Sequence, residues 1–263
     1  MSFLMIAGIN LVAITALMAL GWIVSLVVRK VTFVDSLWGL GFVLIVWITY
    51  FITEGYLLRR YLLVGLTTAW GVRLCLHLSM RNWGHGEDPR YAAWREQAGA
   101  YFWIFSLVKV FLPQALILWV ISLSVQFGQL SLTPNHLTVY DIFGTALWGI
   151  GFFFESIADY QLAKFKADPS NKGKVMSRGL WAYSRHPNYF GEFLIWWGLF
   201  LITLSTPNSW WTIISPLVIT AVLLKMTGVP LMERTIVETR PGYRKYMQRT
   251  NAFFPWFRKK ELA

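Results

Sequence analysis

The sequence predicts an all-α, polytopic membrane protein with about seven transmembrane helices. Three observations support this fold class: 56% of the 263 residues are hydrophobic, only 14% are charged, and the apolar residues occur in long stretches. Soluble domains contain about 25% charged residues, and a helix needs about 20 apolar residues to cross a bilayer. Disordered proteins and ordinary soluble enzymes are therefore disfavoured, and a single cysteine, Cys75, excludes an internal disulfide.

Seven stretches are apolar enough to be membrane helices, since a hydrocarbon core of about 30 Å requires that length. They are 3–28, 33–52, 61–80, 101–125, 140–158, 189–205 and 210–232. The first is longer than the core of a signal peptide and no small-residue cleavage site follows it, so we expect it in the mature protein. The fourth contains Lys109 and Pro113, and the proline is expected to kink it.

The distribution of Lys and Arg predicts the orientation, because basic residues accumulate in cytoplasmic loops. With the C-terminus inside, the cytoplasmic side holds the three longest polar segments, 81–100, 160–188 and 233–263. Only Arg59 and Arg60 then lie outside, and the segment 126–139 has no Lys or Arg. We expect the N-terminus outside, the C-terminus inside, and a location in a bacterial inner (cytoplasmic) membrane. The net charge of +11 follows membrane sidedness and does not indicate a nucleic-acid partner.

Ionisable residues inside the predicted spans are candidate functional residues, because charge is costly in the bilayer. Asp35 opens the second span, and His77 and Arg81 lie one turn apart in the third. Glu155 and Asp159 lie one turn apart at the cytoplasmic end of the fifth. Structural roles compete with functional ones here. Arg73 and His77, one turn apart in the third span, are equally suited to a structural hydrogen-bonded pair, and the two acidic residues of the fifth are suited to an interfacial pair with the lysines of the next loop.

No metal site is expected. His85, Glu87 and Asp88 are close in the sequence and have the chemistry to bind a divalent ion, but nothing else completes a site. The other three histidines are scattered along the chain, and the sequence has no phosphate-binding glycine loop of the soluble dinucleotide type.

The densest polar segment is 177–192, SRGLWAYSRHPNYFGE, which precedes and opens the sixth span. Pro187 suits the first turn of that helix. The free N–H groups of a helix N-terminus, together with Arg185, favour an anion. Asn188 and Glu192 lie one turn apart on one face, where they are suited to bind a polar ring or a ribose.

A second polar group follows the seventh span. It contains Glu233 and the run RPGYRKY at 240–246. Arginines and tyrosines at this spacing are suited to clamp phosphates and to stack on an aromatic base. The competing interpretation is a basic segment that touches anionic lipid beside the membrane.

At these residues the sequence resembles the steroid 5-alpha reductase-like membrane proteins, most closely their bacterial branch. Three blocks support the resemblance in the family's order: ESIADYQLAKFK at 155–166, GLWAYSRHPNYFGE at 179–192, and ERTIVETRPGYRKYMQRTNAFFP at 233–255. The likeness covers about 140–263 and is weaker over 31–100, where VDSLWG and HLSMRN are recognisable. Sterol reductases and isoprenylcysteine carboxyl methyltransferases share this architecture.

The resemblance implies a single integral membrane domain with a cofactor cavity on the cytoplasmic side. Residues 1–139 would lie on the lipid-substrate side, and 140–263 would bind the cofactor. The residues expected to bind the cofactor are Arg81, Arg90, Tyr91, Glu155, Asp159, Lys166, Lys174, Arg185, His186, Asn188, Tyr189, Glu192, Glu233, Arg240, Tyr243 and Arg244. The steroid enzymes polarise the substrate carbonyl with a Glu in the second span and a Tyr in the third, and neither is evident here. His77 and Asp35 are therefore the candidate catalytic residues.

The expected function is the NADPH-dependent reduction of a carbon–carbon double bond in a lipophilic substrate, steroid-like or fatty/isoprenoid. NADPH bears a pyrophosphate and a 2′-phosphate, which the basic cytoplasmic side matches. One alternative is an S-adenosylmethionine-dependent methyltransferase of a lipid or prenylated substrate, which would favour carboxylates such as Glu192, Glu233 and Glu238 around its cationic cofactor. The second alternative is a non-catalytic lipid-binding membrane protein.

Overall fold

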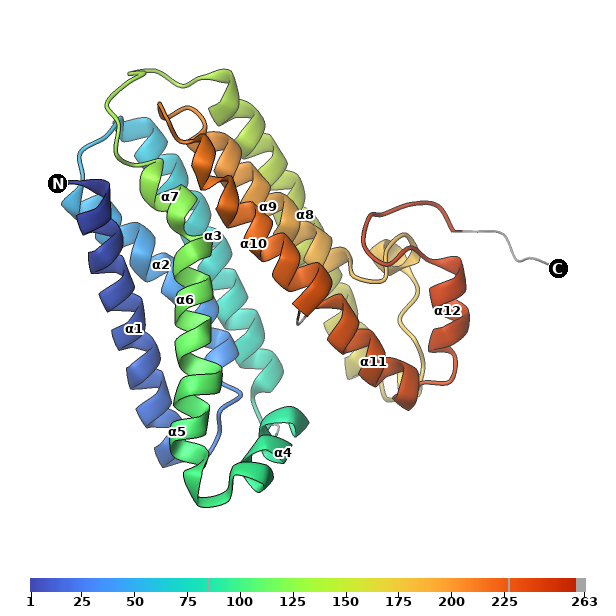
Figure 1. Ribbon diagram of the computed structural model, residues 1–263. Coiled ribbons are helices and arrows are strands. Elements are labelled where there is room, and N and C mark those ends of the chain that lie inside the picture. The colour runs from blue at the N-terminus through green and yellow to red at the C-terminus, as the bar shows by residue number, and fades with distance from the viewer. Residues whose placement is uncertain (85, 227, 259–263) are drawn as a thin grey trace. The chain divides into compact units, whose positions relative to one another are not determined.

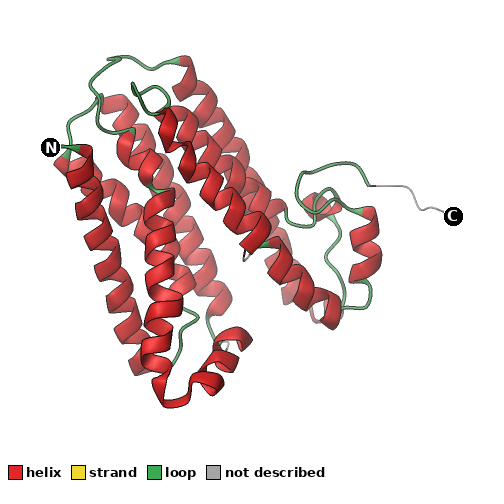
Figure 2. Cartoon of the chain, in the orientation of Figure 1, coloured by secondary structure: helices red, strands yellow, loops and turns green. Residues whose placement is uncertain are grey.

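The computed structural model describes residues 1–84, 86–226 and 228–258 (Figure 1). Within these ranges all regular secondary structure is helical, as Figure 2 shows, apart from an isolated β-bridge between Ser184 and Asn251. The chain forms two compact units. The first comprises Met1–Ile142 and Ile202–Ser215, and the second Phe143–Leu201 and Pro216–Ala263. The division falls three residues after the boundary expected at 139, but the segment 202–215 belongs to the first unit.

Four helices of the described chain are long and apolar enough to cross a membrane. They are α1 (Phe3–Val28), α2 (Val34–Ile52), α3 (Leu57–Asn82) and the combined segment Pro89–Ile121. These correspond to the first four predicted spans. Most described residues of the fifth to seventh predicted spans are helical as well, but α8 (Val139–Ala167), α9 (Pro187–Thr203) and the apolar segment Trp210–Met226 are too polar or too short to meet the same criterion.

The fourth span consists of several helical pieces. It contains α4 (Pro89–Ala98), a 3-10 turn, α5 (Phe102–Ser106), a π-helical turn (Leu107–Phe111) and α6 (Leu112–Ile121), and α7 (Leu123–Phe127) follows. Lys109 lies in the π-helical turn and Pro113 in the first turn of α6. A proline removes one helical N–H donor, and a wider turn directly before it accommodates that loss.

Helices of the first unit approach closely through glycines and are joined by buried amides. A Cβ atom at Gly39 of α2 would lie 2.1 Å from the Gly71 carbonyl oxygen of α3. The Asn10 amide of α1 donates to Thr49 of α2 at 2.8 Å and to Gln126 of α7 at 3.0 Å. Small residues and interhelical hydrogen bonds of this kind hold membrane helices together, since apolar burial gives little driving force in lipid.

The arginines expected outside are bound within the protein. Arg59 is 1% exposed and forms a bidentate pair with Asp141, at 2.9 and 3.1 Å. Asp141 also accepts from the Thr138 backbone at 2.7 Å, and Arg60 lies over the ring of Tyr50 at 4.3 Å. The ion pair therefore fixes the start of α8 to α3 within the first unit.

The second unit contains α8, α9, most of α10 (Ile214–Ala221), a π-helical turn (Val222–Met226), α11 (Val229–Thr239) and α12 (Tyr243–Arg249). α8 and α9 lie side by side (Figure 1). A Cβ atom at Gly191 would lie 2.6 Å from the Gly151 oxygen, and one at Gly198 would lie 2.7 Å from the Gly144 oxygen. Each helix thus has two glycines seven residues apart, and the α8 and α9 backbones approach closely at both positions. This register places the polar C-terminal end of α8 beside the polar N-terminal end of α9.

Candidate functional site

The polar residues predicted on α8 and α9 lie side by side. Gly191 faces the α8 backbone at Glu155, where a Cβ atom would lie 2.4 Å from the Glu155 nitrogen. One turn away, the Asn188 amide donates a hydrogen bond of 3.1 Å to Asp159. Glu155 and Asp159 are buried, and Glu192 lies one turn after Asn188 on α9. The structure therefore brings together four residues that the sequence predicts for cofactor binding.

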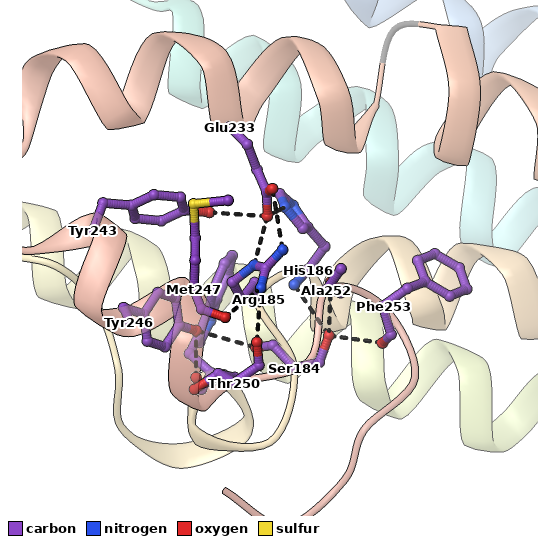
Figure 3. A network of polar contacts seen from close by, with 11 residues as sticks. Ser184, Arg185, His186, Glu233, Tyr243, Tyr246, Met247, Thr250, Ala252 and Phe253 are labelled. Atoms are coloured by element: carbon purple, nitrogen blue, oxygen red, sulfur yellow. Dashed lines mark hydrogen bonds and ion pairs between the residues drawn. The ribbon is translucent and has the colours of Figure 1, made fainter. Parts of the chain in front are cut away.

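Arg185 lies at the centre of a polar network directly before α9 (Figure 3). Its Nε and Nη2 atoms donate to the two carboxylate oxygens of Glu233 on α11, at 2.6 and 3.1 Å. Its Nη1 atom donates to the backbone oxygens of Met247 and Thr250, at 2.9 and 2.8 Å. Four of the five guanidinium N–H groups are thus used inside the unit. Arg185 therefore holds α11 and the end of α12 beside the start of α9. Its fifth N–H group is the one that remains for a phosphate, and direct phosphate binding by Arg185 stays a prediction.

Glu233 is the acceptor of this network. His186 Nε2 lies 3.0 Å from Glu233 Oε1, and the Tyr243 hydroxyl donates to the same oxygen at 3.4 Å. Desolvation acts to raise the pKa of Glu233, but hydrogen bonds from His186 and Arg185 lower it to about 2. Burial, aided by the charge of Glu233, raises the pKa of Tyr243. At neutral pH the network therefore holds an ionised carboxylate and a neutral phenol.

The ring of His186 is stacked on Tyr189, with centroids 5.5 Å apart and the planes within 4°. His186 is buried, directly before Pro187, the first residue of α9. The helix begins where the proline predicts, and Tyr189 is fixed by the stacked imidazole. Both residues were predicted for cofactor binding, and here they connect the Arg185 network to α9.

Ser184 and Tyr246 also belong to the network, although neither was among the residues expected to bind the cofactor and Tyr246 was predicted only as part of the run 240–246. The Ser184 hydroxyl donates to the backbone oxygen of Phe253 at 2.7 Å. The Tyr246 hydroxyl donates to the backbone oxygens of Trp181 and Ser184. Their positions inside the polar runs SRHPNY and RPGYRKY were the sequence features that could have indicated them. A hydroxyl group that hydrogen-bonds to the backbone, however, leaves no charge pattern in the sequence.

The loop between α8 and α9 contains two open hollows that are lined by basic and polar side chains. The larger, of about 370 Å³, is lined by Phe165, Asp168, Ser170, Asn171, Lys174, Val175, Ser177 and Arg178. The smaller, of about 250 Å³, includes Lys166, Lys172 and Arg240 in its lining. Arg240 also donates to the Lys174 backbone oxygen. Three of the cations predicted to bind the cofactor, Lys166, Lys174 and Arg240, therefore lie around these hollows, whereas Arg244 is an exposed residue of α12.

In the first unit, predicted residues gather around the start of α2. Arg81 of α3 lies 3.8 Å from Asp35, and Asp35 also experiences the charge of Arg90. Arg90 donates to the Asp88 carboxylate at 2.8 Å. Desolvation acts to raise the pKa of Asp88, but its hydrogen bonds with Arg90 lower it overall. This group thus contains two carboxylates and two guanidinium groups. Asp88 is the member that was not predicted as a catalytic or cofactor-binding residue.

Two further predicted residues are close in sequence to this ionic group: His77 precedes Arg81 on α3, and Tyr91 follows Arg90 on α4. Tyr91 is buried at 6% exposure and interacts with the side chain of Gln114. The Gln114 oxygen accepts a hydrogen bond of 2.6 Å from the Trp38 indole. His77 is half-buried on α3, one turn before Arg81. Gln114 was not predicted, because a single amide in an apolar helix gives no pattern that separates packing from function.

Within the described ranges, no group of three or more His, Cys, Asp and Glu side chains is arranged to hold a metal ion. Asp88 and Glu87 are instead bonded to arginines, with Glu87 paired to Arg95 at 2.9 Å. His85 lies outside the described residues.

Comparison with known proteins gives one family and one curated relative. A family described as "Protein of unknown function (DUF1295)" matches residues 21–250, which include every residue predicted for catalysis or cofactor binding. An uncharacterized protein of Schizosaccharomyces pombe is 27% identical over an alignment that covers 89% of this chain and 75% of the yeast protein. No solved structure matches the chain significantly.

Proposed function

The chain belongs to the DUF1295 family, which is a steroid 5-alpha reductase-like family, and we propose that it is an NADPH-dependent reductase. Its substrate would be a lipophilic molecule with a carbon–carbon double bond. The likeness to the bacterial branch, and a place in a bacterial inner membrane, are parts of the same proposal.

The larger hollow of the α8–α9 loop is the observation that favours this function. Its volume of about 370 Å³ falls in the range of pockets that bind small molecules. Lys174 and Arg178 supply positive charge, and Ser170 and Ser177 supply hydroxyl donors. Phosphate oxygens are bound by this set of donors, and Phe165 provides an apolar surface for a purine. The basic and hydroxyl residues of the lining therefore fit the phosphorylated adenosine half of NADPH, whereas the carboxylate of Asp168 in the same lining does not favour a phosphate.

The α8–α9 face supplies groups suited to the other half of the cofactor. Asn188 is oriented by Asp159, and Glu192 lies one turn further on α9. Amide and carboxylate side chains on one helix face are able to hydrogen-bond to the carboxamide of a nicotinamide ring. We propose that Asn188 and Glu192 orient this ring and transfer no proton themselves.

When bound, NADPH supplies a hydride to one carbon of the double bond, and the other carbon requires a proton. Asp35 and His77 are the proposed proton donors. Asp35 lies 3.8 Å from Arg81, and it can donate a proton only from its protonated form. Replacement of the true donor should lower kcat and leave NADPH affinity unchanged.

The proposal is tested by measuring NADPH binding to the purified protein. Each charge-assisted contact contributes about 1.5–3 kcal/mol, so Lys174→Ala and Arg178→Ala should each weaken binding by about ten- to a hundredfold, more at low salt than at high salt. Lys245→Ala, an exposed position on α12, is the matched control and should change affinity little. Tight binding of S-adenosylmethionine without binding of NADPH would overturn the assignment.

A methyltransferase is the second candidate, favoured by one specific observation. Glu155 and Asp159 are buried next to α9, and Arg185 is largely committed to Glu233 and backbone oxygens. Carboxylates suit the cationic sulfonium of S-adenosylmethionine better than they suit a pyrophosphate. The same binding measurement distinguishes the two cofactors.

We also propose that α8, α9 and the segment Trp210–Met226 cross the membrane, which makes seven spans with the N-terminus outside and the C-terminus inside. The Lys and Arg asymmetry supports this topology. A reporter fused after Ala263 should be active only in the cytoplasm, and activity only on the outer side would refute it.

A further inference from the structure

After α12 the chain returns along the loop that precedes α9. We call residues 251–258 the strap. The Arg185 backbone N–H donates to the Asn251 oxygen at 2.9 Å, and the Trp256 N–H donates to the Tyr183 oxygen at 3.0 Å. The Arg258 side chain donates to the backbone oxygens of Ala182 and Ser177. The strap is therefore held along its length, with its backbone in one conformation.

The strap turns aromatic rings outward. The exposed fractions are 59% for Phe254, 68% for Trp256 and 75% for Phe257, and Tyr183 beside them is 45% exposed. The Phe257 ring lies 6.1 Å from Tyr183 and 6.3 Å from Trp256. Phe253, in contrast, is buried against Phe193. Tyr183, Trp256 and Phe257 therefore form a continuous exposed patch, whereas the Phe254 ring contacts Phe190, Phe193 and Phe253. Large exposed apolar patches mark interaction surfaces.

Composition identifies the partner. Residues 251–260, NAFFPWFRKK, contain three basic residues and no acidic residue. Trp and Tyr concentrate at the membrane–water interface, where an amphipathic ring meets both lipid and water. Basic residues beside them attract anionic headgroups. This combination of charge and rings fits a bilayer surface better than it fits a second protein.

We infer that the strap is a membrane-surface contact, in which the rings of Tyr183, Trp256 and Phe257 enter the interfacial layer, and that the positive charge of the sequence at 258–260 favours anionic headgroups. This surface does not depend on the identity of the cofactor. Tyr183 of this surface belongs to the loop that also carries Arg185.

The test uses the full chain in nanodiscs of neutral phosphatidylcholine, or of phosphatidylcholine with one third phosphatidylglycerol. In a Cys75→Ser background, an environment-sensitive fluorophore is attached at Phe257→Cys. Its emission should shift to the blue and be quenched by lipids that bear a shallow spin label, more strongly in the anionic discs. Gln248→Cys, an exposed position on α12, is the labelled control and should remain unquenched.

Hydrogen exchange of the strap gives the second measurement. Each basic residue near an anionic surface contributes about 1 kcal/mol, or about fivefold. Lys259→Gln combined with Lys260→Gln should therefore lower strap protection by about 25-fold in anionic discs and leave it unchanged in neutral ones. Trp256→Ser combined with Phe257→Ser should lower protection in both, while the protein still folds, because the backbone contacts remain.

Three results would overturn the inference. The first is a label at position 257 that stays water-exposed in both bilayers. The second is equal quenching in neutral and anionic discs at low salt. The third is protection that appears only at high protein concentration, which would assign the patch to a second copy of the chain.

Discussion

Replacement of Glu233 by Gln tests whether the Arg185 network holds the second unit together. Glu233 accepts from Arg185 through both carboxylate oxygens and from His186 at 3.0 Å. Gln retains one acceptor oxygen and the shape, but it removes the charge that Arg185 faces. Because Arg185 is only 11% exposed in its side chain, the guanidinium is left partly buried without its counter-ion.

The magnitude follows from the pKa of Glu233, which is about 2 in the folded protein instead of the usual 4.5. At about 1.4 kcal/mol for each pH unit between the two values, ionisation of Glu233 stabilises the fold by about 3 kcal/mol. Since the folded pKa is the lower one, this stabilisation is fully present above pH 4.5 and is lost as the pH falls toward 2. We therefore expect Glu233→Gln to lower the unfolding free energy at pH 7 by about 3 kcal/mol.

The assay is thermal unfolding of the purified protein in detergent between pH 2 and pH 7. For a chain of this size, about 3 kcal/mol corresponds to a Tm lower by about 6–12 °C at pH 7. Wild type should lose stability below pH 4.5 more steeply than Glu233→Gln, and the two should converge near pH 2. Glu238→Gln, an exposed position on the same helix, is the control. An unchanged Tm in Glu233→Gln, or an equal loss in Glu238→Gln, would refute the reasoning.

Three further changes test the packing and the site. Gly191→Ala should destabilise the protein by about 1–3 kcal/mol, because the added Cβ would lie 2.4 Å from the α8 backbone. Gly149→Ala is the control and should be neutral, since no atom lies within 4 Å of its added Cβ. Equal melting temperatures for the two variants would contradict the helix contact. Asp141→Asn should lower the free energy of unfolding by about 3–5 kcal/mol, because it leaves Arg59 buried without its partner. Replacing both residues by apolar ones should restore part of that loss. An unchanged melting temperature in Asp141→Asn would show that the pair is not structural. Glu192→Leu should weaken NADPH binding and lower turnover with little effect on melting, and unchanged affinity or a collapsed fold would make Glu192 a packing residue.

Much of the helical framework could be predicted from residue order. The first predicted span coincides with α1 at 3–28, and the start of α9 at Pro187 follows from the fixed backbone angle of proline. The i, i+4 spacings of Glu155 and Asp159 and of Asn188 and Glu192 correctly placed each pair on one helix. These are local properties, and local propensity and hydrophobic length are contained in the sequence itself.

The partner of each charge was decided by tertiary structure. Arg185 looks in sequence like a phosphate ligand, but it meets Glu233, 48 residues away, and backbone oxygens beyond residue 246. Arg59 looks like an exposed loop residue, but it is buried against Asp141, 82 residues away. Side-chain type determines what a residue can bind. Which groups come within 3 Å depends on how the helices pack, and here that packing depends on contacts such as Gly151 with Gly191.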